Sequence, residues 1–441
     1  MSALDEIARN VVATVRTVAK EAGARAVVER TRSANVRFAK NEATTSGEYD
    51  EVSVAVAVVL GKRQAWTSTN QSDPASIKAL VERAVAMARL APEDPETMPL
   101  LAPQPRSPMA PPSAHDEPLA AMDPAARAAV ATRAIAAGDA AKVQIAGFLV
   151  REDRARSIRS STDLAADHRE TEATYTVTAR TPDATGSGWA GREAPRLGDL
   201  DDAALSRTAI DKAVRSARPR QIPPGKYTVV LEPQAVAEML AYMVGSMSLR
   251  SADEGRSYFT GKVGEKIFGG SVSLESNPTD PETPGAVFDG EGMALRPQRW
   301  IEAGRVKDLH VSRFWAAKKA VTPTGSHSVF RLAGGQAPSI DDLVRGTKRG
   351  LLVTRFWYTR MLEPQTVMLT GLTRDGLFLI EDGKITMPVT NFRYNESPVT
   401  VLKNVDALTR ATTRTPNGGG IWHVPALRTH EFTMASPSAA V

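Results

Sequence analysis

The spacing of apolar residues predicts a helix at the start of the chain and a strand-rich stretch after it. Four apolar residues recur at the interval of a helical turn within residues 4–22: Ile7, Val11, Val15 and Val18. Alternating or β-branched residues then predict strands at 25–30, 35–39, 51–60 and 64–69. The Ser72-Asp73-Pro74 segment supplies a cap and a first-turn proline for the next helix.

The same alternation of helix and strand continues as far as residue 218. Residues 92–118 are rich in proline and lack periodicity, so they are predicted to form an extended surface connection. Asp123-Pro124 opens a helix that ends near Gly138, and another helix is predicted over 201–217. Strands are predicted between these helices, at 143–150, 156–161 and 169–180.

The predicted secondary structure changes in the second half of the chain. The Pro-rich segment 219–225 is the best domain boundary, because it ends the preceding helix. Beyond it the pattern is mostly β, with one broad apolar helix at 233–247 and glycine-containing hairpin turns at 302–305 and 381–384. The predicted fold class is α+β. Residues 1–218 form an N-terminal α/β domain that includes the Pro-rich connection, and residues 226–441 form a β-rich domain.

Composition narrows the class of protein. A length of 441 residues suggests two domains, and the chain has no cysteine, which excludes disulfides and thiolate ligands. The net charge of +5 is small and the charges are interspersed, so we expect no nucleic-acid partner. No apolar run is long enough to span a bilayer and no secretory signal is evident, so we expect no membrane partner and a cytoplasmic location.

Ordinary catalytic motifs are absent. The sequence has no Walker loop, no nucleophile elbow and no His-Glu-x-x-His helix. Its six histidines form no pair with metal-ligand spacing, so each is expected to be a surface or hydrogen-bonded residue.

An ordered set of segments in the second half resembles the TldD/PmbA family, also called modulators of gyrase. The segments are PGKYTVVL (224–231), SYFTGKVG (257–264), FDGEG (288–292), PTG (323–325), VTRFWYTR (353–360), TGLTRDG (370–376), FLIEDGKITMPVTNFRYNES (378–397) and VPALR (424–428). In the first half, VRFAKNE (36–42) is similar to an early hairpin of the family. The resemblance therefore extends over nearly the whole chain.

The resemblance implies a site that this chain lacks. In peptidase-active TldD-like members, a His-Glu-x-x-x-His helix holds zinc with a later cysteine, and its glutamate can act as the base. By ungapped counting from Ser257, those helix positions fall here on Leu240, Ala241 and Gly245. None of these residues can bind zinc, residues 232–247 contain no histidine, and we expect no cofactor in this chain.

The resemblance further implies a zinc-free, TldE/PmbA-like subunit. Such a chain pairs with a TldD-like, HExxxH-bearing paralogue that carries the zinc, and the pair encloses a chamber for unfolded or modified peptides. A peptide substrate held by strand addition would need little sequence specificity. Residues of the most family-like segments are the candidates for lining the chamber or the subunit interface: Arg355, Tyr358, Thr373, Arg374 and Asp375.

Three alternatives stay open at this point. Phe356 and Trp357 can instead pack in the core while residues 374–376 make a simple turn. The chain can be a non-catalytic homodimeric scaffold that binds peptides. It can also be a metal-independent enzyme that uses carboxylates and arginine on a modified peptide.

Overall fold

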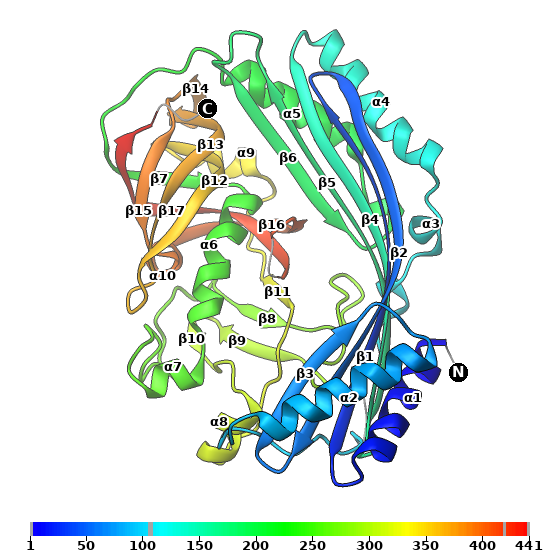
Figure 1. The fold of residues 1–441 in the computed structure, drawn as a ribbon. Coiled ribbons are helices and arrows are strands. Elements are labelled where there is room, and N and C mark those ends of the chain that lie inside the picture. The colour runs from blue at the N-terminus through cyan, green and yellow to red at the C-terminus, as the bar shows by residue number, and fades with distance from the viewer. Residues whose placement is uncertain (1–2, 105–108, 418–419, 439–441) are drawn as a thin grey trace.

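Two β-sheets stand side by side in the computed structural model, which describes residues 3–104, 109–417 and 420–438 (Figure 1). The first sheet has six antiparallel strands in the order β3-β2-β1-β4-β5-β6. Its strands are β1 (Gly23–Ala39), β2 (Glu42–Leu60), β3 (Arg63–Thr69), β4 (Gln144–Ser160), β5 (Ala165–Arg180) and β6 (Ser187–Ala194). The α+β class predicted from the pattern is confirmed.

The long strands of the first sheet correct two predicted interruptions. The predicted strands 25–30 and 35–39 are one strand, β1, and the predicted strands 143–150 and 156–161 are one strand, β4. Polar residues in the middle of these strands suggested breaks. The strand pairing continues through these polar residues because neighbouring strands supply opposite charges. For example, Arg30 of β1 forms an ion pair with Asp50 of β2 at 2.5 Å.

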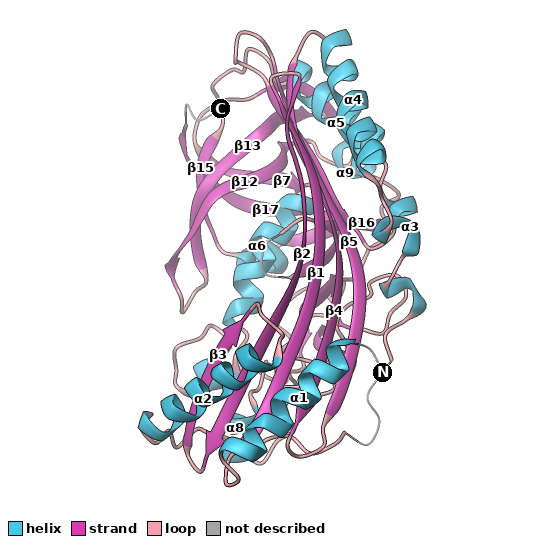
Figure 2. Cartoon of the chain, turned by 45° about the vertical axis from the view of Figure 1, so that its right-hand side comes forward, coloured by secondary structure: helices cyan, strands magenta, loops and turns pink. Residues whose placement is uncertain are grey.

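Helices cover one face of the first sheet, called here its outer face (Figure 2). Helices α1 and α2 pack on one end of this face through a valine- and alanine-rich cluster, and α4 and α5 pack on the other end. Asp73 and Asp123 cap α2 and α4, as their sequence motifs predict. The bounds are α1 (Ala3–Val18), α2 (Pro74–Leu90), α4 (Pro124–Ala140) and α5 (Asp202–Arg215).

The Pro-rich connection contains little regular structure. Its described residues include only a 3₁₀ turn, η1 (Pro112–Ala114), and the start of α3 (Glu117–Ala120). Residues 105–108 lie outside the described residues. A second 3₁₀ turn, η2 (Leu197–Asp199), precedes α5.

The second sheet is mixed and has eleven strands. Strands β7, β12, β13, β15 and β17 pair in a closed ring, because β17 pairs with β15 on one side and with β7 on the other. The ring strands are β7 (Gly225–Leu231), β12 (Arg349–Glu363), β13 (Met368–Glu381), β15 (Phe392–Glu396) and β17 (Ile421–Pro437). The others are β8 (Leu274–Ser276), β9 (Gln298–Glu302), β10 (Arg305–Val306), β11 (Val329–Leu332), β14 (Lys384–Pro388) and β16 (Val405–Thr415).

Helix α6 (Pro233–Ser246) follows β7 and packs against the ring through the largest apolar cluster of the molecule. This confirms the helix predicted at 233–247, and the two predicted hairpin turns join β9 to β10 and β13 to β14. The remaining helices are short: α7 (Leu249–Asp253), α8 (Arg313–Lys319), α9 (Ile340–Arg345) and α10 (Pro398–Lys403). Among the described residues, no helix is long and apolar enough to cross a membrane.

The two sheets touch at several places. Val287 and Phe288, which precede β9, pack on Ile158 of β4. The Ser187 hydroxyl of β6 donates to Asp375 of β13 at 2.6 Å, and farther along the sheet Arg414 of β16 binds Glu172 of β5 at 2.7 Å. The uncovered face of the first sheet, called here its inner face, is therefore turned toward the second sheet.

Candidate functional site

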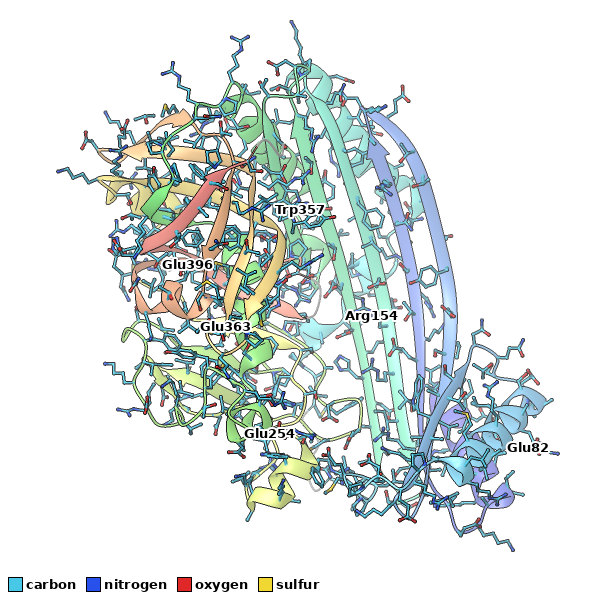
Figure 3. The ribbon with its side chains drawn as sticks, turned by 60° about the vertical axis from the view of Figure 1, so that its left-hand side comes forward. Glu82, Arg154, Glu254, Trp357, Glu363 and Glu396 are labelled. Atoms are coloured by element: carbon cyan, nitrogen blue, oxygen red, sulfur yellow. The ribbon has the colours of Figure 1, made fainter. Side chains whose placement is uncertain are left out.

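The inner face of the first sheet is strongly charged. Every second residue of a strand points to the same face, and on this face many such positions of β1, β4, β5 and β6 carry ionisable side chains. These residues are Glu29, Glu152, Arg154, Arg156, His168, Glu170, Glu172 and Glu193. Arg154, labelled in Figure 3, lies on β4 and pairs with Glu152 and Glu170.

Two glutamates of the inner face have opposite pKa shifts. Burial raises the pKa of the Glu170 carboxyl, but the hydrogen bond from His168 and the charge of Arg154 outweigh it and hold that pKa at about 2. Burial and the nearby Glu172 carboxylate raise the pKa of Glu193 to about 8, against the smaller lowering effect of Arg414. The Glu193 carboxyl therefore binds a proton more readily than an exposed glutamate does.

Helix α6 and strand β12 form the opposing surface. Arg355 binds Glu238 of α6 with a nitrogen–oxygen distance of 3.3 Å, and Glu238 also accepts the backbone N–H of Phe356 at 2.6 Å. Burial raises the pKa of Glu238, and the positive charge of Arg355 opposes that shift. These residues line a cavity of about 340 Å³ together with Ala241, Tyr242, Trp357, Tyr358, Thr359 and Asn417.

Aromatic rings and guanidinium groups stack at the edge of this cavity. The Arg355 guanidinium lies 4.6 Å from the ring centre of Trp189 on β6 and 5.4 Å from that of Trp357. The Arg374 guanidinium also lies over Trp357, 4.8 Å from the centre of its ring. Trp357, labelled in Figure 3, is 39% exposed, so it does not pack in the core as Phe356 does. Such cation–π contacts hold flat cationic and aromatic groups in register.

Tyr358 is the most exposed of the predicted site residues. Its φ of +54° is unusual for a bulky side chain, and it lies where the pairing of β12 with β13 shifts register between Trp357 and Arg360. The residue is 67% exposed, and the Arg360 guanidinium lies 5.5 Å from the centre of its ring. The bulge thus turns Tyr358 outward.

The other two predicted site residues are buried. Thr373 donates from its hydroxyl to Asn391 at 3.0 Å and accepts the Phe392 N–H at 2.9 Å, which is a core role. Asp375 binds Ser187 and so joins the sheets. Residues 374–376 do not make the simple turn of the alternative interpretation: Asp375 and Gly376, both with positive φ, form a bulge within the continuous strand β13.

The three degenerate metal-site positions lie on two sides of α6, since Ala241 and Gly245 are four residues apart and share a face that Leu240 does not. Leu240 is buried in the apolar core, Ala241 lines the Glu238–Arg355 cavity, and Gly245 is exposed in the last turn. Their side chains offer no donor atom to a metal ion. Across residues 3–104, 109–417 and 420–438, no three His, Asp or Glu side chains gather closely enough to hold one.

Several residues of this region could not be found from the sequence. Glu193, Glu238, Trp189 and Arg414 stand in no motif, and only the tertiary fold brings them together. The alternation around β5, in which Glu170 and Glu172 share one face, was the one available signal for the charged inner face.

Two family models match this arrangement. The PmbA/TldA metallopeptidase C-terminal domain matches residues 224–436, and the PmbA/TldA metallopeptidase domain 1 matches residues 24–88. The fold and the matched segments thus define a protein with the architecture of a metallopeptidase family. The chain belongs to the TldD/PmbA family, as the ordered segments predicted.

Solved structures share the fold over nearly the whole chain. TldE from Thermococcus kodakarensis superimposes with a TM-score of 0.88 at 18% identity, covering 98% of this chain and 100% of that one. A candidate modulator of DNA gyrase from Thermotoga maritima gives 0.86 at 16% identity, covering 97% and 100%. At these identities the likeness concerns the fold.

Curated relatives match over shorter segments. A protein of Methanothermobacter thermautotrophicus named metalloprotease is 25% identical over 238 residues, which is 50% of each chain. A protein of Methanocaldococcus jannaschii is 31% identical over 126 residues, 28% of this chain and 30% of that one. This chain therefore spans half or less of the curated relatives it matches.

Proposed function

We propose that this chain is the subunit without zinc in a two-subunit peptidase of the TldD/TldE type. One observation carries the proposal: on α6 the positions of the family's two histidines and glutamate hold Leu240, Ala241 and Gly245. The surrounding region has a charged inner face opposite helix α6 and strand β12, which carry paired charges and stacked aromatic rings. The fold shared with TldE of Thermococcus kodakarensis supports the assignment.

In this proposal the chain supplies part of a closed chamber. A TldD-like paralogue with the His-Glu-x-x-x-His helix holds the zinc, which activates water for attack on the peptide bond. The inner face and the Glu238–Arg355 cavity line the part of the chamber that receives unfolded or modified peptide. Trp357 and Tyr358, exposed at the bulge of β12, contact the peptide or the paralogue.

Co-expression with the paralogue tests the proposal. Light scattering should give the mass of a complex containing both chains, and elemental analysis should find one zinc per complex and none per isolated chain. Cleavage of a fluorescent, unfolded polypeptide should require both chains and should stop when the paralogue's motif glutamate is changed to glutamine. One tightly bound zinc per isolated chain would overturn the assignment.

The same experiment distinguishes the proposed peptidase subunit from the alternative of a homodimeric scaffold. A homodimer that binds peptide but does not bind the paralogue would show that this chain works without a peptidase subunit. Trp357→Ala, with Leu90→Ala on α2 as an exposed apolar control away from this region, then shows whether Trp357 contacts the paralogue or the peptide.

One observation favours a metal-independent enzyme as a second candidate. Glu193 has a pKa raised to about 8 beside Glu172 and Arg414, so it can donate a proton near neutral pH. Turnover by the isolated chain that survives exhaustive chelation and is abolished by Glu193→Gln would establish this candidate. Turnover that vanishes with the chelator would eliminate it.

A further inference from the structure

A second cavity opens at the end of α6, one helical turn beyond Ala241. Its volume is about 230 Å³. It lies between the last turn of α6, strand β9 and the segment that leads into β11. Its lining residues are Val244, Gly245, Met247, Ser248, Trp300, His310, Ser326, His327 and Phe330.

Aromatic rings dominate the lining of this cavity. Trp300 and His327 meet edge to face, with ring centres 5.5 Å apart, and Phe330 is stacked on Trp422 at 4.9 Å. The indole N–H of Trp300 is already used, since it donates to Ser276 at 2.8 Å. Fixed rings and the thioether of Met247 favour another aromatic ring, which gains edge-to-face and sulfur contacts that an aliphatic side chain does not make.

The cavity carries no charge at neutral pH. Burial lowers the pKa of His327 to about 4, and burial also lowers the pKa of His310. Nε2 of His327 is buried and has no hydrogen-bond partner among the described residues, so a positive ring would be poorly solvated. Among the described residues, no carboxylate or ammonium group belongs to the lining, so a charged ligand group would find no partner there.

The size of the cavity indicates a single side chain. Sites for complete small-molecule ligands usually occupy roughly 300–1,000 Å³, which is more than this cavity offers. Gly245 stands on its rim, and a Cβ built on Gly245 meets no atom within 4 Å. The position that the family gives to a histidine therefore leaves open space beside the cavity here.

We propose that this cavity binds the side chain of an aromatic residue in the peptide substrate. The inference rests on the proposed function, in which the chain faces a peptide, and adds to it a preference for phenylalanine, tyrosine or tryptophan at one position. Gly245 admits the side chain, and Trp300, His327 and Phe330 surround it.

Binding is tested on the isolated chain, without paralogue or zinc. The probes are capped pentapeptides Gly-Gly-X-Gly-Gly in which X is Phe, Leu or Glu. The chain has only six histidines, so its ¹³Cε1-labelled imidazole signals can be resolved by NMR, and His327→Gln assigns the reporter signal. The Phe peptide should move the His327 and His310 signals and bind at least about tenfold more tightly than the Leu peptide, and the Glu peptide should not bind.

A matched pair of variants locates the binding. Gly245→Leu fills the rim of the cavity and should weaken binding of the Phe peptide at least about tenfold. Gly198→Leu adds the same side chain at another position where a Cβ meets no atom within 4 Å, and should leave the affinity unchanged. Thermal unfolding of both variants checks that each is folded.

The outcomes are separate from those of the proposed function. Equal binding of the Phe, Leu and Glu peptides, or full affinity in a folded Gly245→Leu variant, overturns the aromatic site even if the complex cleaves peptides. A complex that never forms overturns the proposed function, while the NMR titration still reports on the cavity.

Discussion

Two cavities share helix α6 and differ in how they treat charge. The one beside Ala241 contains Glu238 and Arg355, which are both mostly buried and bind each other. The one beside Gly245 contains two imidazoles that burial keeps neutral. In the first cavity the charge of Arg355 opposes the rise that burial causes in the Glu238 pKa, whereas in the second cavity the effect of burial prevails at His327.

Removing the partner of Glu238 should have the largest effect. The side chains of Arg355 and Glu238 are 15% and 13% exposed, so Arg355→Ala leaves a buried carboxylate without its cation. We expect the free energy of unfolding at pH 7.5 to fall by about 3 kcal/mol, measured by urea denaturation.

Two controls sharpen this result. Arg360→Ala, on the same strand but exposed, should cost less than about 1 kcal/mol. The double variant Glu238→Gln/Arg355→Met, which removes both charges, should recover most of the loss. If Arg355→Ala costs no more than Arg360→Ala, the pair does not stabilise the fold.

The pH dependence of stability should distinguish the neutral cavity beside Gly245 from the cavity that contains Glu238 and Arg355. His327 has a folded pKa of about 4, below the ordinary 6.5, so between these values the unfolded chain binds more protons. The stability that His327 provides is complete above pH 6.5 and is lost as the pH falls through 4. His327→Phe should flatten the dependence in this window by up to about 1 kcal/mol per pH unit, measured by urea denaturation at pH 4.5, 5.5 and 6.5.

Glu193 serves as a control because its pKa is shifted in the opposite direction from that of His327. Its folded pKa of about 8 lies above the ordinary 4.5, so its contribution is complete below pH 4.5 and is lost as the pH rises through 8. Glu193→Gln should therefore flatten the profile between pH 5 and 8, and the part above pH 6.5 reports Glu193 alone, because His327 no longer titrates there. Equal profiles for His327→Phe and the unmodified chain would contradict the assignment of a neutral imidazole.

The smallest predicted effect concerns the rim of the neutral cavity. Gly245→Ala adds a methyl group in open space within the last turn of α6, so it should raise the free energy of unfolding by about 0.5–1 kcal/mol. Gly188→Ala is the contrasting variant, because its Cβ would lie 2.1 Å from the Ala209 carbonyl oxygen and must destabilise the chain. Destabilisation by Gly245→Ala would mean that the rim is not open.

Local pattern predicted most of the elements but not their pairing. Capping by Asp73 and Asp123 and the periodicity of α6 are local signals, and the structure confirms them. The continuity of β1 and β4 was missed, since the charges that support their polar centres come from other strands. The closed ring was beyond prediction from pattern, because nothing local in β7 indicates that β17 is its neighbour.

The candidate site was predictable only in part. The resemblance pointed to Arg355 and Arg374, which the structure places beside Trp357, and to Thr373, which it buries. The roles of these residues in a chamber or interface stay a prediction. Glu193 and Glu238 were missed because a raised carboxyl pKa depends on burial and on neighbours distant in sequence.

The ring of β7, β12, β13, β15 and β17 has a consequence for the order of folding. Its first and last strands are joined directly, as where Leu231 pairs with Leu427. A pairing so distant in sequence carries a large loop-closure entropy and forms slowly. The ribosome must therefore release β17 before the second sheet can close, whereas the first sheet has all its strands available by Ala194. Until then the apolar face of α6 lacks the part of its packing surface that β17 provides, and such exposed apolar surface is prone to aggregation.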